Sequence, residues 1–325
     1  MFERIHISNY KSLSDIRADL GRYNIVVGAN DSGKTSFAEV FYLLKLYGCR
    51  REKDILRFLG PYGDFVTDGD TSRNIAIAFK YEGKDYTFEF TGRKGAVEIV
   101  RTNIDSEIRR VLKRVTVILP IDYSGIIRSK SRRADDYLEP NCGNLVNVVL
   151  GLIEKERRSE ESDFVEFPAE IVDDIRVFFE HYIPYLRMEG KEIQLYIKDL
   201  SRNKIMPARH VPGGFIKLLA IITAIHLKPS VLVIDEFENA LHFRLQELLL
   251  KHFLENIEQV IVITHSPIPI EIFMDNLPRS EIKILGFSKS IENVTAVKDF
   301  DEEEEIIRFL ENQGISKPML YLSRV

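Results

Sequence analysis

The sequence predicts an α/β protein with a parallel core sheet, an antiparallel β-subdomain and a helical lobe. From residue 214 onward, strand-like and helical segments alternate, which is typical of a parallel sheet covered by helices on both faces. Residues 74–101 contain three strand-like runs separated by turns with glycine, as in an antiparallel meander. Residues 134–190 carry apolar positions at helical spacing. Together these three patterns define the expected fold class.

The N-terminal third is expected to begin with strands and then to form one helix. Two strands joined by a turn at 9–12 precede a short apolar strand, and a helix follows a glycine-rich loop. Their expected ranges are strands 2–8, 13–19 and 23–27, helix 33–47, and strands 75–81, 85–91 and 96–101.

The remaining elements follow the same periodicity rules. Apolar helical faces are expected at 145–153 and 171–182, followed by a strand at 193–197. The α/β part is expected to contain helix 214–226, strand 231–234, helix 241–256, strand 260–264, helix 267–275 and strand 282–286. The acidic run 299–305 suits the start of a helix, where negative charge complements the helix dipole.

Composition excludes several classes of protein. The 325 residues are 45% apolar and 29% charged, and 45 Lys and Arg against 50 Asp and Glu give a net charge of −5. This balance argues against a polycation, although it allows a local basic patch. Cys49 and Cys142 form no CxxC pair, so neither a disulfide framework nor a cysteine zinc site is expected. With no apolar signal stretch and no run of about 20 apolar residues, we expect a cytoplasmic protein without membrane association.

The strongest local signal is a phosphate-binding loop. Residues 28–35 match GxxxxGK[ST], follow the expected strand 23–27 and open a helix, the context in which backbone N–H groups surround phosphates. We expect Lys34 to reach the β- and γ-phosphates of ATP and Thr35 to ligate Mg²⁺. An accidental glycine-rich turn is the alternative. The predicted nucleotide-binding residues are Gly28, Asn30, Asp31, Ser32, Gly33, Lys34, Thr35 and Ser36.

Two later strands end in residues that suit the same chemistry. The apolar strand 231–234 delivers Asp235 and Glu236 to the carboxyl edge of a parallel sheet, where ligands bind. Asp235 is expected to hold Mg²⁺ and Glu236 to activate a water molecule, although such a strand alone is usually structural. His265 follows strand 260–264 at the same edge, with Ser266 as an N-cap, and is expected to polarise the γ-phosphate.

These motifs together resemble the ABC-type ATPase superfamily in its SMC/RecF/OLD branch, and OLD-like ATPases without a Toprim domain in particular. The resemblance covers residues 1–48 and 205–275. It rests on Ile7–Ser12 ("IxNFKS"), the GxN form of the Walker A loop at Gly28–Asn30, the Walker B run Asp235–His242 ("DEPENxLHP") and the histidine switch Thr264–Pro267.

The resemblance implies a P-loop NTPase fold, that of an ABC-type ATPase head, which hydrolyses ATP to ADP and phosphate. Residues 1–48 and 205–298 would form its nucleotide-binding core, 73–102 a β-subdomain, 134–190 a helical lobe and 299–325 a C-terminal helical tail. Two heads would enclose ATP in a head-to-tail homodimer, in which Gly213 and Gly214 of the signature segment contact the γ-phosphate in trans. Such heads act in DNA maintenance or anti-phage defence.

Two departures leave other functions open. Pro212 or Gly213 stands where the signature serine belongs, and no glutamine occurs between the phosphate loop and Gln194 to supply a Q-loop. The alternative interpretation of this segment is a Pro-Gly-Gly turn before a core helix. Slow or partner-dependent turnover is therefore expected, and an ATP-gated scaffold that controls a separate effector, a nuclease or toxin, is the main alternative. A nucleotide-binding subunit of a transporter is the weakest one.

The segment between the ATPase motifs adds two expectations. It is too short, and lacks the heptads, for a long coiled coil. Residues 101–133 contain nine basic side chains and three acidic ones, which suggests a nucleic-acid patch or, equally, a solvated loop or arginines that contact ATP or a partner. The basic residues are Arg101, Arg109, Arg110, Lys113, Arg114, Arg128, Lys130, Arg132 and Arg133.

Overall fold

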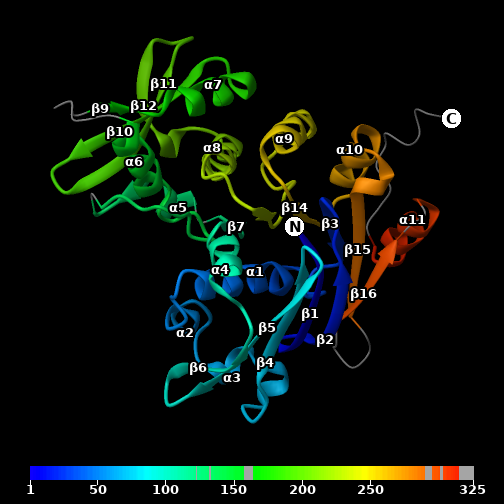
Figure 1. Ribbon diagram of the computed structural model, residues 1–325. Helices are drawn as coiled ribbons and strands as arrows, with labels where there is room; N and C mark the ends of the chain where they lie inside the picture. The colour runs from blue at the N-terminus through cyan, green and yellow to red at the C-terminus, as the bar shows by residue number, and fades with distance from the viewer. Residues whose placement is uncertain (122, 132, 157–163, 290–294, 301–302, 315–325) are drawn as a thin grey trace. The chain divides into compact units, whose positions relative to one another are not determined.

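The computed structural model of the protein describes residues 1–121, 123–131, 133–156, 164–289, 295–300 and 303–314 (Figure 1). The chain forms two compact units. The first comprises residues 1–115, 230–238 and those from 257 onward, and the second comprises residues 116–229 and 239–256. Each unit has its own sheet or sheets and its own buried apolar side chains.

The core of the first unit is a sheet whose strand order is β16-β15-β3-β14-β13, and Val115, the first residue of β7, also belongs to this unit. Strand β3 pairs in parallel with β14 and β15, and β14 pairs in parallel with β13, while β16 pairs antiparallel with β15. Every residue of β3, β13 and β14 is buried, which explains why their sequences are continuous apolar runs. The bounds are β3 Tyr23–Gly28, β7 Val115–Ile118, β13 Val231–Ile234, β14 Val260–Thr264, β15 Ile282–Lys289 and β16 Thr295–Phe300.

Helices of the first unit complete the α/β pattern. Helix α1 buries Phe37, Val40 and Phe41 as the helical spacing predicts. It packs so closely on α4 that a Cβ on Gly48 would lie 2.7 Å from Leu112 Cβ. The helical segments are α1 Lys34–Gly48, α2 Asp54–Leu59, α3 Tyr62–Phe65, η1 Thr67–Gly69, α4 Ser106–Lys113, α10 Ile268–Asn276, η3 Arg279–Glu281 and α11 Glu303–Asn312.

A second sheet of the first unit is antiparallel throughout, with the order β2-β1-β4-β5-β6. The meander expected at 74–101 is confirmed as β4, β5 and β6, and β4 alternates buried and half-buried residues. Strands β1 and β2 join the same sheet through the β1–β4 pairing, which the sequence did not indicate. The bounds are β1 Phe2–Tyr10, β2 Leu13–Asp19, β4 Ile75–Tyr81, β5 Lys84–Arg93 and β6 Ala96–Thr102.

The second unit combines helices with a five-stranded antiparallel sheet, in which β12-β11-β10-β9 is the strand order and β8 pairs with β11 as the fifth strand. Helices α7 and α8 are linked by a contact of 2.8 Å between His226 Nε2 and Asp174 Oδ2. The bounds are α5 Tyr123–Ile126, β8 Arg128–Ser129, α6 Leu145–Glu156, β9 Phe164–Glu166, α7 Ala169–Phe178, β10 Tyr182–Glu189, β11 Glu192–Asp199, β12 Lys204–Pro207, η2 Ala208–His210, α8 Gly213–His226 and α9 Phe243–Asn256.

The expectation of a helical lobe over 134–190 is only partly correct. Helices α6 and α7 are present, but residues 182–189 form β10, which pairs with β11 along its whole length. Pro184 and Leu186 are buried while Tyr185 and Arg187 are half-buried, so the true period there is two. The segment before α6 contains Pro140 and the positive φ of Cys142, and neither suits a helix.

The C-terminal expectation also needs correction. Asp299 and Phe300 end strand β16 instead of starting a helix, and α11 begins at Glu303. Residues 315–325 of the expected tail lie outside the described residues. Within the part of the chain that the structure describes, every helix falls short of the length and apolarity needed to cross a membrane.

Candidate functional site

The phosphate-binding loop connects β3 to α1 in the first unit. Gly28 lies so close to β15 that a Cβ there would be 2.1 Å from the Phe287 carbonyl oxygen. Gly33 has a φ of +95°, which favours glycine, at the residue before α1. The sequence thus places glycine where the loop passes a neighbouring backbone and where it turns into the helix.

Lys34 folds back over this loop. Its Nζ donates hydrogen bonds to the carbonyl oxygens of Gly28 at 2.8 Å and Ala29 at 2.6 Å. Burial lowers the pKa of Lys34, while the nearby carboxylates of Asp235, Glu238 and Glu236 act in the opposite direction. The ammonium is therefore poorly solvated, and it is held by neutral carbonyl groups that a more negative ligand can replace.

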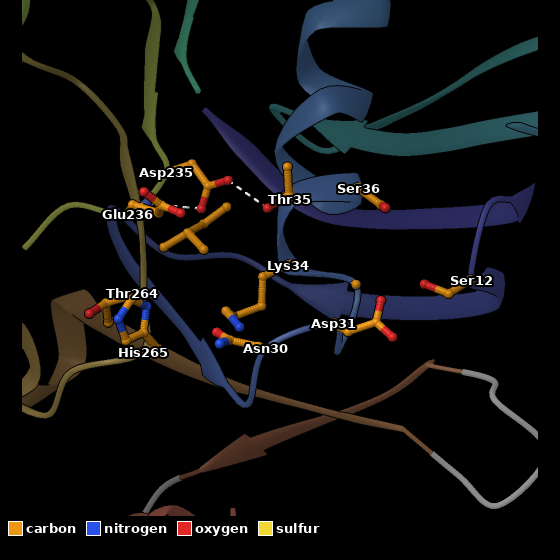
Figure 2. Close-up of a pocket in the computed structure, with 12 residues that line it drawn as sticks. Ser12, Asn30, Asp31, Lys34, Thr35, Ser36, Asp235, Glu236, Thr264 and His265 are labelled. Atoms are coloured by element: carbon orange, nitrogen blue, oxygen red, sulfur yellow. Dashed lines mark hydrogen bonds between the residues drawn. The ribbon is translucent and has the colours of Figure 1, made fainter. Parts of the chain in front are cut away.

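A hydrogen bond connects the residue that follows β13 to the first turn of α1. Thr35 Oγ1 donates to Asp235 Oδ2 at 2.7 Å, and the Glu236 N–H donates to Asp235 Oδ1 at 2.9 Å (Figure 2). Burial raises the pKa of Asp235, and these two hydrogen bonds oppose the rise. Glu236 has a φ of +48°, an unusual backbone conformation for a residue with a side chain.

His265 stands at the end of β14, as the sequence predicts. Ser266 N–H donates to Thr264 Oγ1 at 2.9 Å, and Ile268 N–H donates to Ser266 Oγ at 3.2 Å, so Ser266 does stabilise the start of α10. The helix begins at Ile268, one residue later than expected. The His265 side chain is 51% exposed and lines a cleft.

That cleft has a volume of ≈ 320 Å³, and twelve residues line it (Figure 2). Most of the predicted residues meet there, although their sequence positions span more than 200 residues. Ser12, Ile263 and Thr264 also line it and were not predicted as site residues. The lining residues are Ser12, Asn30, Asp31, Gly33, Lys34, Thr35, Ser36, Asp235, Glu236, Ile263, Thr264 and His265.

Four predicted residues lie elsewhere. Gly28 and Ser32 are buried within the loop and do not line the cleft. Gly213 and Gly214 belong to the second unit, where they open α8 after Pro212. Gly214 is buried, and a Cβ there would lie 2.3 Å from the Ala240 carbonyl oxygen, so close packing alone requires glycine at this position.

The oxygen atoms of Thr35 and Asp235 fit a magnesium ion. Mg²⁺ prefers oxygen ligands and is usually held by one or two protein groups together with phosphates and water. The hydrogen-bonded hydroxyl and carboxylate supply such a pair at the cleft. Among the described residues, no cluster of three or more His, Cys, Asp or Glu side chains forms an all-protein metal cage.

The basic region 101–133 is divided between the two units, and several of its side chains are already engaged. Arg109 lies 3.9 Å from the centre of the Tyr47 ring, donates to the Tyr47 carbonyl oxygen at 2.7 Å and pairs with Glu52. Arg128 pairs with Glu192. Arg132 lies outside the described residues. These contacts reduce the charge available for a partner.

Comparison with known proteins supports the same fold. Residues 117–269 match the family model described as "AAA domain, putative AbiEii toxin, Type IV TA system". A crystal structure of the SMC head bound to the C-terminal winged-helix domain of ScpA matches with a TM-score of 0.59 and 14% identity, over 94% of this chain and 99% of that one. An SMC head with an extended coiled coil bound to the C-terminal domain of ScpA, derived from Pyrococcus furiosus, matches with a TM-score of 0.59 and 14% identity, over 96% of this chain and 98% of that one. No curated protein sequence matches the chain.

Proposed function

Because the chain has the P-loop NTPase fold of an ABC-type, SMC-like ATPase head, we propose that it binds ATP with Mg²⁺ in the described cleft and hydrolyses it. The observation that carries the proposal is the hydrogen bond from Thr35 to Asp235. It joins the phosphate-binding loop to the carboxylate strand across 200 positions of sequence, next to the buried Lys34 ammonium.

Each residue of the cleft has a role in this proposal. Lys34 exchanges its carbonyl contacts for the β- and γ-phosphates, and the N–H groups at the start of α1 face the phosphate chain. Thr35 and Asp235 hold Mg²⁺, which neutralises phosphate charge when bound. Glu236 accepts a proton from the attacking water, and His265 polarises the γ-phosphate from the end of the neighbouring strand β14.

We further propose that ATP joins two copies into a head-to-tail homodimer, with Gly213 and Gly214 of one copy completing the site of the other. Glu236→Gln should bind Mg-ATP without hydrolysing it and elute as a dimer in size-exclusion chromatography with light scattering. Lys34→Ala is the matched control and should stay monomeric. A Glu236→Gln protein that binds ATP and remains a monomer at saturation would contradict the dimer.

A second function is supported by the signature segment. Helix α8 begins after Pro212, which supplies neither a hydroxyl nor an N–H group, and its first turn has no side-chain cap. Weaker contact with the γ-phosphate favours a scaffold or regulator that turns over little ATP and controls an effector protein in trans, a nuclease or toxin. Hydrolysis by the purified wild type far above that of Lys34→Ala would exclude this function.

The finer assignments follow as proposals. Both units form one ATPase domain of the OLD-like type, with the segment boundaries expected from the sequence, and it acts in the cytoplasm in DNA maintenance or anti-phage defence. The matching family is described by a toxin–antitoxin system, which supports the defence role. Nucleic acid would contact the Arg101–Arg133 region, and its binding should weaken steeply with salt. Duplex DNA titrated by fluorescence anisotropy at two salt concentrations tests this contact.

A further inference from the structure

One buried carboxylate beside the cleft has no part in the proposed chemistry so far. Glu238 follows Asp235 by three residues but does not line the cleft. The chain turns sharply after β13, since Glu236 has a positive φ and the Phe237 N–H donates to the Ile263 carbonyl oxygen at 3.0 Å. This turn, with the Phe237 ring fully buried, brings Glu238 to the end of β14.

The Glu238 carboxylate meets His265 at two atoms. Its Oε1 accepts a hydrogen bond from the His265 backbone N–H at 3.1 Å and lies 3.1 Å from His265 Nδ1. Glu238 is only 13% exposed at its side chain, while His265 is 51% exposed. The carboxylate is therefore largely buried, whereas the imidazole that it contacts is open to the cleft.

The second oxygen of this carboxylate is buried and lacks a hydrogen-bond partner in the described structure. Burying a carboxylate with an unsatisfied oxygen is costly unless a nearby positive or donor group compensates. The other oxygen lies beside the His265 ring, and the positive charge of the Lys34 ammonium interacts with the carboxylate. A buried carboxylate with an unpaired oxygen that lies against a cleft-lining histidine is placed to act through that histidine.

We propose that Glu238 is a positioning residue, which engages His265 Nδ1 and thereby presents His265 Nε2 to the cleft. A histidine ring presents different groups at its two nitrogens, and the partner of one nitrogen decides what the other offers. With Nδ1 protonated toward Glu238, Nε2 of the neutral ring is an acceptor for a hydrogen bond from the attacking water, and it gains the N–H that a γ-phosphate oxygen accepts only when the ring takes up a second proton. This assignment rests on the proposed function, under which the γ-phosphate and the attacking water lie in the cleft.

Figure 2 shows His265 on the side of the cleft that carries Asn30 and Lys34, away from Ser12 and Ser36. A free imidazole ring at that rim would rotate and sample both tautomers. The contact with Glu238 removes that freedom before substrate arrives, which is the usual benefit of a group that orients a reacting side chain.

The first test needs no turnover. The protein labelled with ¹⁵N-histidine, in which seven histidines give signals, is examined by long-range ¹H–¹⁵N NMR at pH 8.5 without nucleotide, and His265→Ala identifies the His265 signal. We expect the Nδ1–H tautomer in the wild type and in Glu238→Gln, whose amide oxygen still accepts. Glu238→Ala should revert to the Nε2–H form that predominates in free histidine. An unchanged tautomer in Glu238→Ala would overturn the proposal.

The second test separates positioning from general support of the loop. Glu238→Ala should lower kcat by about tenfold or more, the usual cost of losing the partner that orients a functional histidine, with unchanged affinity for a fluorescent ATP analogue. In a protein that already carries His265→Ala, adding Glu238→Ala should lower kcat no further. Equal losses in both backgrounds, or a loss of ATP affinity, would show that Glu238 supports the loop as a whole and overturn the proposal. Glu238→Gln should retain most of kcat.

The two tests distinguish failure of this inference from failure of the proposed function. If the wild type hydrolyses no ATP, the kinetic arm gives nothing to compare and the ATPase proposal fails, while the tautomer of His265 still tests Glu238. If the wild type is active and the tautomer does not depend on Glu238, the ATPase proposal stands and the positioning role is wrong.

Discussion

Replacing Gly28 with alanine tests whether close backbone packing fixes the phosphate-binding loop. The added Cβ would lie 2.1 Å from the Phe287 carbonyl oxygen, where an ordinary contact needs more than 3 Å. Gly28 and Phe287 are paired residues of β3 and β15, so relief requires these strands to separate by roughly 1 Å. Overpacking of this kind costs about 1–3 kcal/mol, and a weakened ladder hydrogen bond adds about 1 kcal/mol.

Gly83 provides the matched control, because its φ is +77° and a Cβ there would meet nothing within 4 Å. Gly83→Ala therefore carries only backbone strain, about 1 kcal/mol, against about 3 kcal/mol for Gly28→Ala. For 325 residues an unfolding entropy of roughly 0.7 kcal/mol/K converts this difference to about 3 °C in thermal midpoint.

The assay is a thermal melt followed by circular dichroism for both variants and the wild type, with a fluorescent ATP analogue as a second readout. Gly28→Ala should melt at a lower temperature than Gly83→Ala. It should also lose nucleotide affinity, because the Gly28 carbonyl oxygen accepts a hydrogen bond from Lys34 and thereby helps to position it. Equal midpoints for the two variants would refute the steric argument.

Three further changes test other parts of the fold. Gln259→Leu should destabilise the first unit by about 2–4 kcal/mol in urea melts, because it leaves the buried backbone N–H and C=O of Phe2 unpaired; an effect under 1 kcal/mol would contradict this. Burial raises the pKa of Cys142 to about 12, so its thiolate fraction at pH 8 is about 10⁻⁴ and iodoacetamide should label Cys142 only after denaturation, whereas half-buried Cys49 should label first; rapid native labelling of Cys142 is the contrary result. Arg109→Lys should lower the free energy of unfolding by about 1 kcal/mol in the same urea melts, because lysine cannot stack on the Tyr47 ring and donate to the Tyr47 carbonyl oxygen as arginine does. An unchanged free energy of unfolding would show that this contact does not stabilise the packing of α4 on α1.

The parts of the site that sequence predicted well are those whose chemistry requires a local arrangement. A phosphate-binding loop needs a strand before it and a helix after it, so the motif at Gly28–Thr35 also predicts β3 and α1. Asp235 and His265 follow buried apolar strands, and parallel pairing brings the carboxyl ends of such strands to one edge.

The residues that were missed owe their positions to contacts that leave no local pattern. Ser12 reaches the cleft beside the buried Thr295, whose hydroxyl donates to Ser12 Oγ at 2.9 Å across 283 positions. Glu238 belongs to the Walker B run, but only the turn after β13 brings it to His265. The sequence predicts a helix where β10 forms because the apolar residues there fit both periods, and only the pairing with β11 selects the strand.

The electrostatics of the cleft point to a ligand independently of any motif. Burial lowers the pKa of Lys34 and raises that of Asp235, so both groups are poorly solvated in their charged forms. Glu236 adds a strained backbone at the same sheet edge. Among the described residues, the hydrogen-bond partners of the Lys34 ammonium are loop carbonyl oxygens and a hydroxyl, and those of Asp235 are the Thr35 hydroxyl and the Glu236 N–H, so both charges are held by neutral groups. A polyanion that offers phosphate to Lys34 and carries a divalent cation to Asp235 relieves both electrostatic costs at once, and Mg-ATP has this charge pattern.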